Sequence, residues 1–93
     1  MILSFGSKET YLIWSGTRVR NMPADIQKIG RRKLRMLNNS QDFEDLRIPP
    51  SNRLEKLTGN LKGYLSIRIN NQWRIIFKWV DGNAIDVQII DYH

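Results

Sequence analysis

The sequence predicts an α+β fold in a single domain, residues 1–93, with two helices followed by an antiparallel sheet. Apolar residues recur with helical spacing in the first half of the chain. From Arg53 onward they alternate with polar residues, as in strands that bury one face. Short turn sequences separate the alternating runs. The expected order of elements is β-α-α-β-β-β-β, with both helices packed on one face of the sheet.

The first half of the chain contains one short strand candidate and two helices. The apolar run Ile2–Phe5 is typical of a strand. Ser7 is a suitable N-cap for the first helix, and Gly16 is placed to end it. The second helix is expected to start at 21–23, because proline is favoured in a first helical turn, and to end at 38–40.

Basic residues are concentrated on the second helix and the segment before it. The net charge of the chain is +6, and seven bases with one acid lie between Arg18 and Arg35, so this segment carries all of it. The apolar residues of the helix share one face and the bases lie mostly on the other. This pattern indicates a polyanionic partner such as nucleic acid, or alternatively a solvated helix face. The bases expected to bind RNA or the ribosome are Arg18, Arg20, Lys28, Arg31, Arg32, Arg35 and, later in the chain, Lys56.

Four strands are expected in the second half, at residues 53–57, 64–70, 73–80 and 84–92. Residues 47–52 precede them as an extended connector. No helix is expected in this connector, because each proline of Pro49-Pro50 restricts the residue before it.

The loop at 70–72 predicts how the second and third of these strands pair. A three-residue loop pairs Ile67 with Ile75 and places the apolar residues of both strands on one face, which a two-residue loop would not do. The same register sets Arg68 opposite Arg74 on the bare face, away from the core. Like charges in that arrangement destabilise a sheet, so this face is either ordinary exposed sheet or a surface that binds an anion.

A three-residue loop is also expected at 81–83, because its last residue, an asparagine, tolerates a positive φ. This loop pairs Trp79 with Ile85 and Lys78 with Asp86.

Composition excludes several kinds of site. The chain has no cysteine, which rules out disulfides and thiolate metal sites, and its single histidine and scattered acids make metal catalysis unexpected. No serine lies in a nucleophile elbow, and there is no Gly-rich phosphate loop. No apolar run is long enough to span a bilayer and the start does not resemble a signal peptide, so a cytoplasmic location is expected.

The only histidine follows an acid and a tyrosine in Asp91-Tyr92-His93, and the predicted register brings Tyr92 to the side of the paired arginines. These groups suit metal-free RNA cleavage, in which the ribose 2′-hydroxyl is the nucleophile. Arginines would neutralise the phosphate, His93 would carry a proton, and Tyr92 would stack or donate a hydrogen bond. Asp91 would orient one of them or carry the second proton. The alternative is structural: Tyr92 packs on the sheet, Asp91 caps the strand and His93 is an ordinary chain end.

Three motifs resemble the HigB-type toxins of the RelE superfamily, also known as plasmid-maintenance killer proteins. They are PPSNRLEKLTG, SIRINNQWRI and the final DYH. The resemblance covers essentially the whole chain and implies the RelE-like microbial RNase fold. It also implies a type II toxin, an endoribonuclease without a cofactor that cuts mRNA in the ribosomal A site and leaves a cyclic phosphate.

The resemblance implies partners as well. These are a HigA-type helix-turn-helix antitoxin that neutralises the toxin, the ribosome (30S A site) and mRNA, and operator DNA reached through the antitoxin, but no membrane.

The catalytic residues that the resemblance implies are Asp91, Tyr92, His93, Arg74 and, less directly, Arg68. Some family members carry a histidine and a lysine where this chain has Glu55 and Thr58. Glu55 is therefore expected to replace the base, unless the three final residues carry more of the catalysis. Lys56 should point to the opposite face from Glu55 because side chains alternate along a strand.

Two other functions remain open on the sequence. One is a non-catalytic RNA- or ribosome-binding module that inhibits translation with the same basic helix. The other is a degenerate family member that only partners a repressor.

Overall fold

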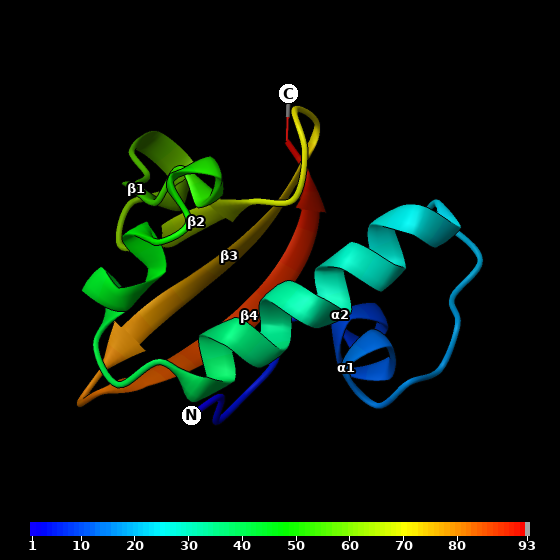
Figure 1. Ribbon diagram of the computed structural model, residues 1–93, viewed down its shortest axis with the longest axis horizontal. Helices are drawn as coiled ribbons and strands as arrows, with labels where there is room; N and C mark the ends of the chain where they lie inside the picture. Colours follow the sequence, from blue (N-terminus) through cyan, green and yellow to red (C-terminus); the bar gives the residue numbers. More distant parts are fainter. Residues whose placement is uncertain (93) are drawn as a thin grey trace.

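The structure is a computed structural model, and it describes residues 1–92. Two helices come first, α1 (Lys8–Trp14) and α2 (Ala24–Asn39). They are followed by the four strands of one sheet (Figure 1), which are β1 (Glu55–Lys56), β2 (Leu65–Arg68), β3 (Trp73–Val80) and β4 (Asn83–Asp91). Every pair of neighbouring strands is antiparallel, in the order β1-β2-β3-β4. The predicted α+β architecture is confirmed.

Several element boundaries differ from the prediction. β1 and β2 are shorter than expected, and 3₁₀ turns at Phe43–Arg47, Pro50–Asn52 and Gly59–Leu61 lie between α2 and β2. The expectation of a purely extended connector at 47–52 is therefore wrong. Proline at the first position of a 3₁₀ turn loses no hydrogen bond, since that N–H has no partner within the turn.

The helix ends follow from their capping residues. The Ser7 hydroxyl accepts a hydrogen bond from the Thr10 N–H at 3.2 Å, which makes Ser7 the N-cap of α1. Gly16 follows the helix with φ +93°, a conformation that L side chains rarely adopt. Pro23 occupies the N-cap position of α2 rather than its first turn.

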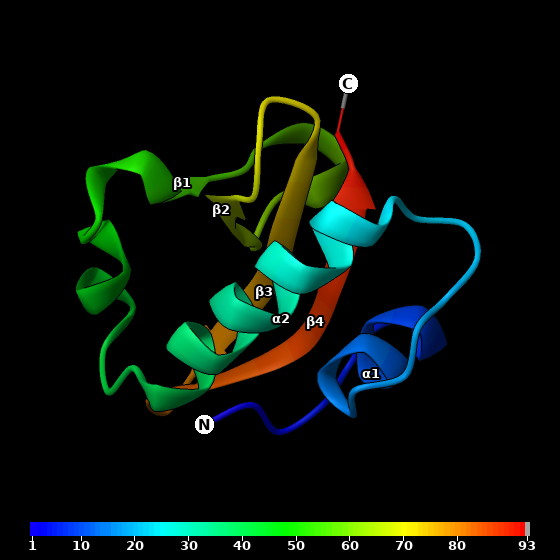
Figure 2. The ribbon, with the colours of Figure 1, turned by 45° about the vertical axis from the view of Figure 1, so that its right-hand side comes forward.

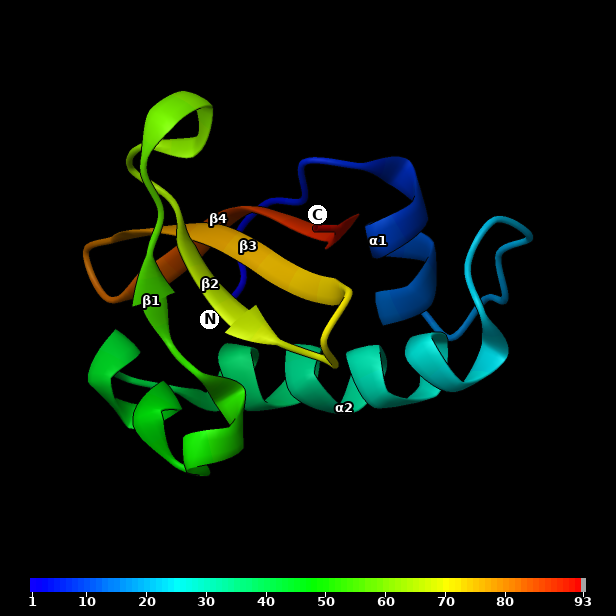
Figure 3. The same cartoon turned by 90° about the horizontal axis from the view of Figure 1, so that it is seen from above.

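The core lies between α2 and the sheet, and Figures 2 and 3 show α2 running across one face of the strands with α1 beside it on the β4 side. Ile26, Leu34 and Leu37 of α2 are buried against this face. Phe77 and Val87 meet them from the sheet. None of the helices described is long and apolar enough to cross a membrane.

The first residues of the chain form isolated bridges rather than a regular strand. They run parallel to β4, with Ile2 bridged to Ala84 and Phe5 to Val87. The Gly6 N–H donates to the Val87 carbonyl at 2.9 Å, and a Cβ on Gly6 would lie 2.5 Å from Gln88 Cγ. A glycine therefore permits this close approach of the N-terminal segment to β4.

The predicted register between β2 and β3 is confirmed. Ile67 pairs with Ile75 in the core, and Arg68 pairs with Arg74 on the opposite face. We call this opposite face, which points away from α2, the outer face.

The predicted register between β3 and β4 is wrong near the turn. Trp79 pairs with Ala84, because the turn has two residues, Asp81 and Gly82, with φ values of +52° and +79°. A β-bulge then adds one residue to β4 at Asp86, whose φ is +56°. Beyond the bulge the expected frame returns.

The sequence predicted a bare outer face, but several side chains of this face are buried. Ser66 is 0%, Ile76 2% and Arg74 8% exposed. The Arg74 side chain lies across β2 to reach Glu55 on β1 instead of standing away from the sheet.

Candidate active site

Arg74 is the centre of the candidate site on the outer face. Its Nη1 donates a hydrogen bond to Glu55 Oε1 and forms an ion pair with that carboxylate. Its Cζ lies 4.5 Å from the centroid of the Tyr92 ring. The guanidinium is thus held between a carboxylate on one side and an aromatic face on the other, which orients it without filling all of its donor positions.

The ion pair between Arg74 and Glu55 crosses a strand. Glu55 belongs to β1 and Arg74 to β3, and β2 lies between them. The residues of β2 that face the pair are Ser66, directly opposite Glu55, and Arg68, directly opposite Arg74. Ser66 and Arg68 therefore lie on the same face as the ion pair, and the sequence predicted this facing position for the two arginines.

The site carries an excess of positive charge. Arg68 donates from Nη1 to the Asn71 side-chain oxygen at 3.2 Å, a neutral partner, whereas Arg74 has Glu55. The buried Nε atoms of both arginines have no hydrogen-bond partner among residues 1–92. Two guanidiniums on one face of the sheet are suited to a phosphate group, which accepts several charge-assisted hydrogen bonds at once.

The end of the chain reaches the site through Tyr92. The Tyr92 N–H donates to the Gln72 carbonyl at 2.7 Å, so the segment stays attached to the loop before β3. Asp91 pairs with Trp73, and its Oδ2 accepts a hydrogen bond from Gln72 Nε2 at 3.1 Å. Asp91 lies next to the site, and strand alternation puts it on the other face from Ile90, the partner of Arg74. His93 lies outside the described residues.

A second polar group lies farther along the outer face, and the sequence did not predict it. The Tyr64 hydroxyl donates to Asp86, and this hydrogen bond, with burial, raises the pKa of Tyr64. The Lys78 ammonium lies 5.0 Å from the centroid of the Tyr64 ring. The sequence did place Lys78 opposite Asp86, which could have indicated a polar group here. In the structure the bulge moves Asp86 out of that register, and Lys78 pairs with Ile85.

Most of the predicted basic residues gather around the N-terminal half of α2. Arg18, Lys28 and Arg31 line one hollow of about 200 Å³, and Arg18 and Arg20 line a second of about 370 Å³. The buried Gln27 amide shapes this region, since its Oε1 accepts from the Val19 N–H at 2.9 Å.

The remaining predicted bases have different surroundings. Arg32 and Arg35 are exposed on α2. Lys33, between them in sequence, is half-buried and donates a hydrogen bond to Asn52. Burial, and to a smaller extent the charge of Arg32, lower the pKa of Lys33. Lys56 lies apart from them, at a hollow of about 300 Å³ whose other lining side chains include Trp79. We call Arg18, Arg20, Lys28, Arg31, Arg32 and Arg35 the basic surface.

The basic surface and the candidate site lie on different sides of the molecule. α2 covers the core-facing side of the sheet (Figure 3). Arg74 belongs to the opposite, outer face. A single polyanion would therefore have to pass around the sheet to touch both, whereas a large partner could contact the basic surface and present a separate strand to the outer face.

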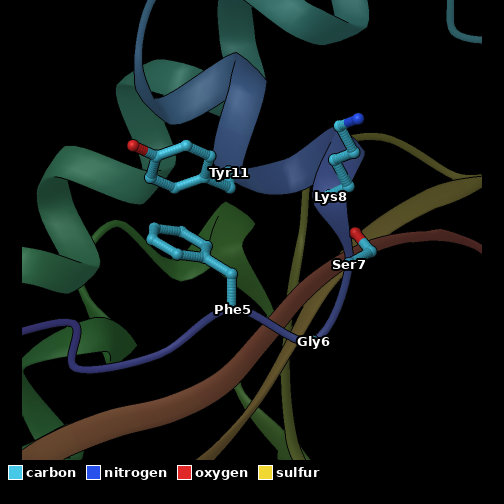
Figure 4. Close-up of a pocket in the computed structure, with 5 residues that line it drawn as sticks. All are labelled: Phe5, Gly6, Ser7, Lys8 and Tyr11. Carbon is cyan, nitrogen blue, oxygen red and sulfur yellow. The ribbon is translucent and has the colours of Figure 1, made fainter.

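A further hollow of about 430 Å³ lies near the start of α1 and is lined by Phe5, Gly6, Ser7, Lys8 and Tyr11 (Figure 4). The Phe5 and Tyr11 rings meet edge to face, with centroids 5.7 Å apart. Lys8 is the only charged side chain of this lining, so the hollow lacks the acid and base groups that the outer face provides. Residues 1–92 contain no group of three potential metal ligands.

Comparisons with known proteins show the family of the chain. A family model described as the RelE-like toxin of type II toxin–antitoxin system HigB matches residues 4–93. Toxin HigB-1 of Vibrio cholerae serotype O1 is 51% identical over 72 residues, which cover 77% of this chain and 76% of that protein. Endoribonuclease HigB of Proteus vulgaris is 31% identical over 94 residues, with 100% of both chains covered.

Solved structures share the fold. The YoeB–YefM complex from Staphylococcus aureus matches with a TM-score of 0.62 at 20% identity, covering 100% of this chain and 98% of that chain. A YafQ mutant from E. coli matches with a TM-score of 0.60 at 17% identity, covering 98% and 93%. These two likenesses confirm the predicted RelE-like fold.

Proposed function

Since the chain belongs to the HigB family of RelE-like toxins of type II toxin–antitoxin systems, we propose that it is an endoribonuclease toxin whose active site is the outer face around Arg74. The observation that carries the proposal is that Arg74 contacts both the Glu55 carboxylate and the Tyr92 ring and has a second arginine, Arg68, directly opposite it on β2. The name of the Proteus vulgaris relative, an endoribonuclease, supports the same activity.

The proposed reaction uses the 2′-hydroxyl of the substrate as nucleophile. The 2′-oxygen attacks the adjacent phosphorus, its proton passes to a base, and the bond between phosphorus and the 5′-oxygen breaks. The leaving 5′-oxygen takes a proton from an acid, so the products are a 2′,3′-cyclic phosphate and a 5′-hydroxyl. Arg68 and Arg74 stabilise the charge that grows on the phosphoryl oxygens.

Glu55 is the proposed base, because its carboxylate is the one that contacts Arg74 in the described part of the chain. A phosphate bound by Arg74 competes with Glu55 for the same guanidinium. Substrate binding thus frees the carboxylate next to the bond that reacts. The final residues supply the acid, and His93 is our choice for it, since an imidazole gives up a proton near neutral pH. Tyr92 holds Arg74 in place and can stack on a base.

We propose that the substrate is mRNA in the ribosomal A site, in the cytoplasm. The separation of the basic surface from the outer face supports this: α2 can hold ribosomal RNA while the ribosome presents the mRNA to Arg74. The proposed inhibitor is a HigA-type antitoxin, which would also link the toxin to operator DNA. The Staphylococcus aureus toxin with the same fold is seen in a complex with YefM.

Induced expression with and without the neighbouring antitoxin gene tests the proposal. We expect growth arrest without the antitoxin, together with new 5′-hydroxyl ends inside translated transcripts. Growth arrest without new ends would favour the non-catalytic translation inhibitor, and an absence of toxicity would favour a degenerate partner of a repressor.

Ribosome association should depend on the basic surface. We expect the double variant Arg32→Ala/Arg35→Ala to bind ribosomes more weakly, with a slope of log affinity against log salt that falls by about 1 for each phosphate that the variant no longer binds. The measurement is ribosome pelleting at several salt concentrations. The control is Arg47→Ala/Lys62→Ala, which removes the same charge elsewhere on the surface. Equal salt slopes in the two variants would contradict a role for α2.

A further inference from the structure

Ser66 is a buried polar side chain that the proposed mechanism leaves unused. It lies in the middle of β2, is 0% exposed, and its Oγ has no hydrogen-bond partner among residues 1–92. A buried hydroxyl that forms no hydrogen bond destabilises a fold, and an alanine would occupy the same place without that penalty. Folding therefore gives no reason for a serine here.

The position of Ser66 connects it to the candidate site. It is the direct cross-strand partner of Glu55, and directly opposite residues have their Cβ atoms about 4.5–5.5 Å apart. The ion pair joins Glu55, opposite Ser66, to Arg74, opposite Arg68, so it crosses β2 between Ser66 and Arg68 on the outer face. Of the two cross-strand partners of Ser66, Ile76 is apolar, and the other is Glu55, the proposed base.

We propose that Ser66 is a positioning residue that holds Glu55 during RNA cleavage. When a phosphate takes the guanidinium of Arg74, the Ser66 hydroxyl donates a hydrogen bond to the released Glu55 carboxylate. The carboxylate then stays over β2, oriented toward the 2′-hydroxyl, instead of turning into solvent. This inference rests on the proposed endoribonuclease function and deepens it.

This proposed change of partner, in which Glu55 leaves Arg74 and accepts from Ser66, explains why the Ser66 hydroxyl has no hydrogen bond in the free protein. Glu55 satisfies its charge with Arg74 while no substrate is bound, and its side chain is 48% exposed, so it has room to move. Ser66 is fixed within the sheet and loses little freedom when the new hydrogen bond forms. A donor prepared in this way serves the substrate-bound state rather than the resting one.

The test compares Ser66→Ala with Ser40→Ala in steady-state cleavage of mRNA on ribosomes with an open A site. For Ser66→Ala we expect kcat to fall about 10- to 100-fold, the worth of one hydrogen bond to a charged group, with KM changed by less than about twofold. Its Tm should stay equal or rise, because an unpartnered hydroxyl is removed. Ser40 is also buried, but its hydroxyl donates to the Met36 carbonyl at 2.8 Å, so Ser40→Ala should lower Tm by about 2–8 °C and keep kcat.

A double-mutant cycle shows whether Ser66 acts through Glu55. In a Glu55→Gln background, Ser66→Ala should lower the residual rate by less than about twofold, since the carboxylate that it positions is already absent. Full additivity would overturn the assignment to Glu55.

Two further outcomes are distinguishable. Wild-type cleavage with an unchanged kcat for Ser66→Ala overturns the role of Ser66 alone. No cleavage by the wild-type protein means that the endoribonuclease proposal fails, and the role of Ser66 fails with it.

Discussion

Replacing Arg74 with alanine is expected to lower the rate of RNA cleavage by about 10²–10³-fold, the usual loss when one group that stabilises transition-state charge is removed. The guanidinium is almost buried and contacts both Glu55 and Tyr92, so it is held in one place on the outer face. Its removal takes away the charge and also the group that holds the other two side chains together. The measurement is the single-turnover rate on ribosome-bound mRNA.

Two variants control for this result. Arg74→Lys keeps the charge but not the planar fork of donors, so its rate should lie between those of the wild type and Arg74→Ala. Arg47→Ala removes an exposed arginine that is paired with Glu44 and should cleave at the wild-type rate. If Arg74→Ala folds and retains cleavage within a few-fold of the wild type, the outer face is not the active site.

Replacing Glu55 with glutamine should lower the cleavage rate by about 10²–10⁴-fold, the range for removal of a general base. The amide has the shape of the carboxylate but does not accept the 2′-hydroxyl proton. Because the Arg74 side chain is almost buried, the loss of its counter-charge should also lower the free energy of unfolding, by about 1–3 kcal/mol. Single-turnover rates and urea unfolding measure the two quantities.

The control for Glu55→Gln is Glu9→Gln, an exposed acid in the first turn of α1. Glu9→Gln should cleave normally. A Glu55→Gln protein that is fully active would assign the base role to the end of the chain. If the Arg74 and Glu55 variants bind ribosomes but no longer cleave RNA, the protein is an enzyme. If the same variants still arrest growth as the wild type does, the protein is a non-catalytic translation inhibitor.

Loop length allowed one half of the site to be predicted from the sequence. An odd number of residues at 70–72 is required to keep Ile67 and Ile75 on one face, and this requirement alone places Arg68 opposite Arg74. Burial of apolar side chains is a strong constraint, and it predicted the correct register between β2 and β3. The core therefore determined where two of the charged residues lie.

The contact between Glu55 and Arg74 was not predictable in the same way. β1 has two residues, and both are exposed, so no apolar pattern sets its register against β2. The chain between β1 and β2 contains the 3₁₀ turn at Gly59–Leu61, which was not predicted from the sequence. The burial of Ser66 and Ile76 was missed for a related reason, since alternation tells which face a side chain is on but not what lies across it.

Turn chemistry accounts for the error between β3 and β4. Asp-Gly is a favoured pair for a two-residue hairpin turn, in which both residues have positive φ, and the structure uses it. The predicted three-residue loop placed the positive φ at Asn83, because such a loop satisfies the apolar alternation without further adjustment. The protein satisfies the alternation differently, with a tight turn and a bulge.

The bulge at Asp86 makes the number of residues in this hairpin as important as their identity. Deleting that residue would remove the bulge and leave a regular ladder, in which Gln88 stays opposite Ile76 and Tyr92 stays beside Arg74. Inserting one residue between 88 and 89, in the regular part of β4, would instead move Ile89 to the outer face and carry Tyr92 to the other face from Arg74. The deletion should therefore keep cleavage activity, and the insertion should abolish it.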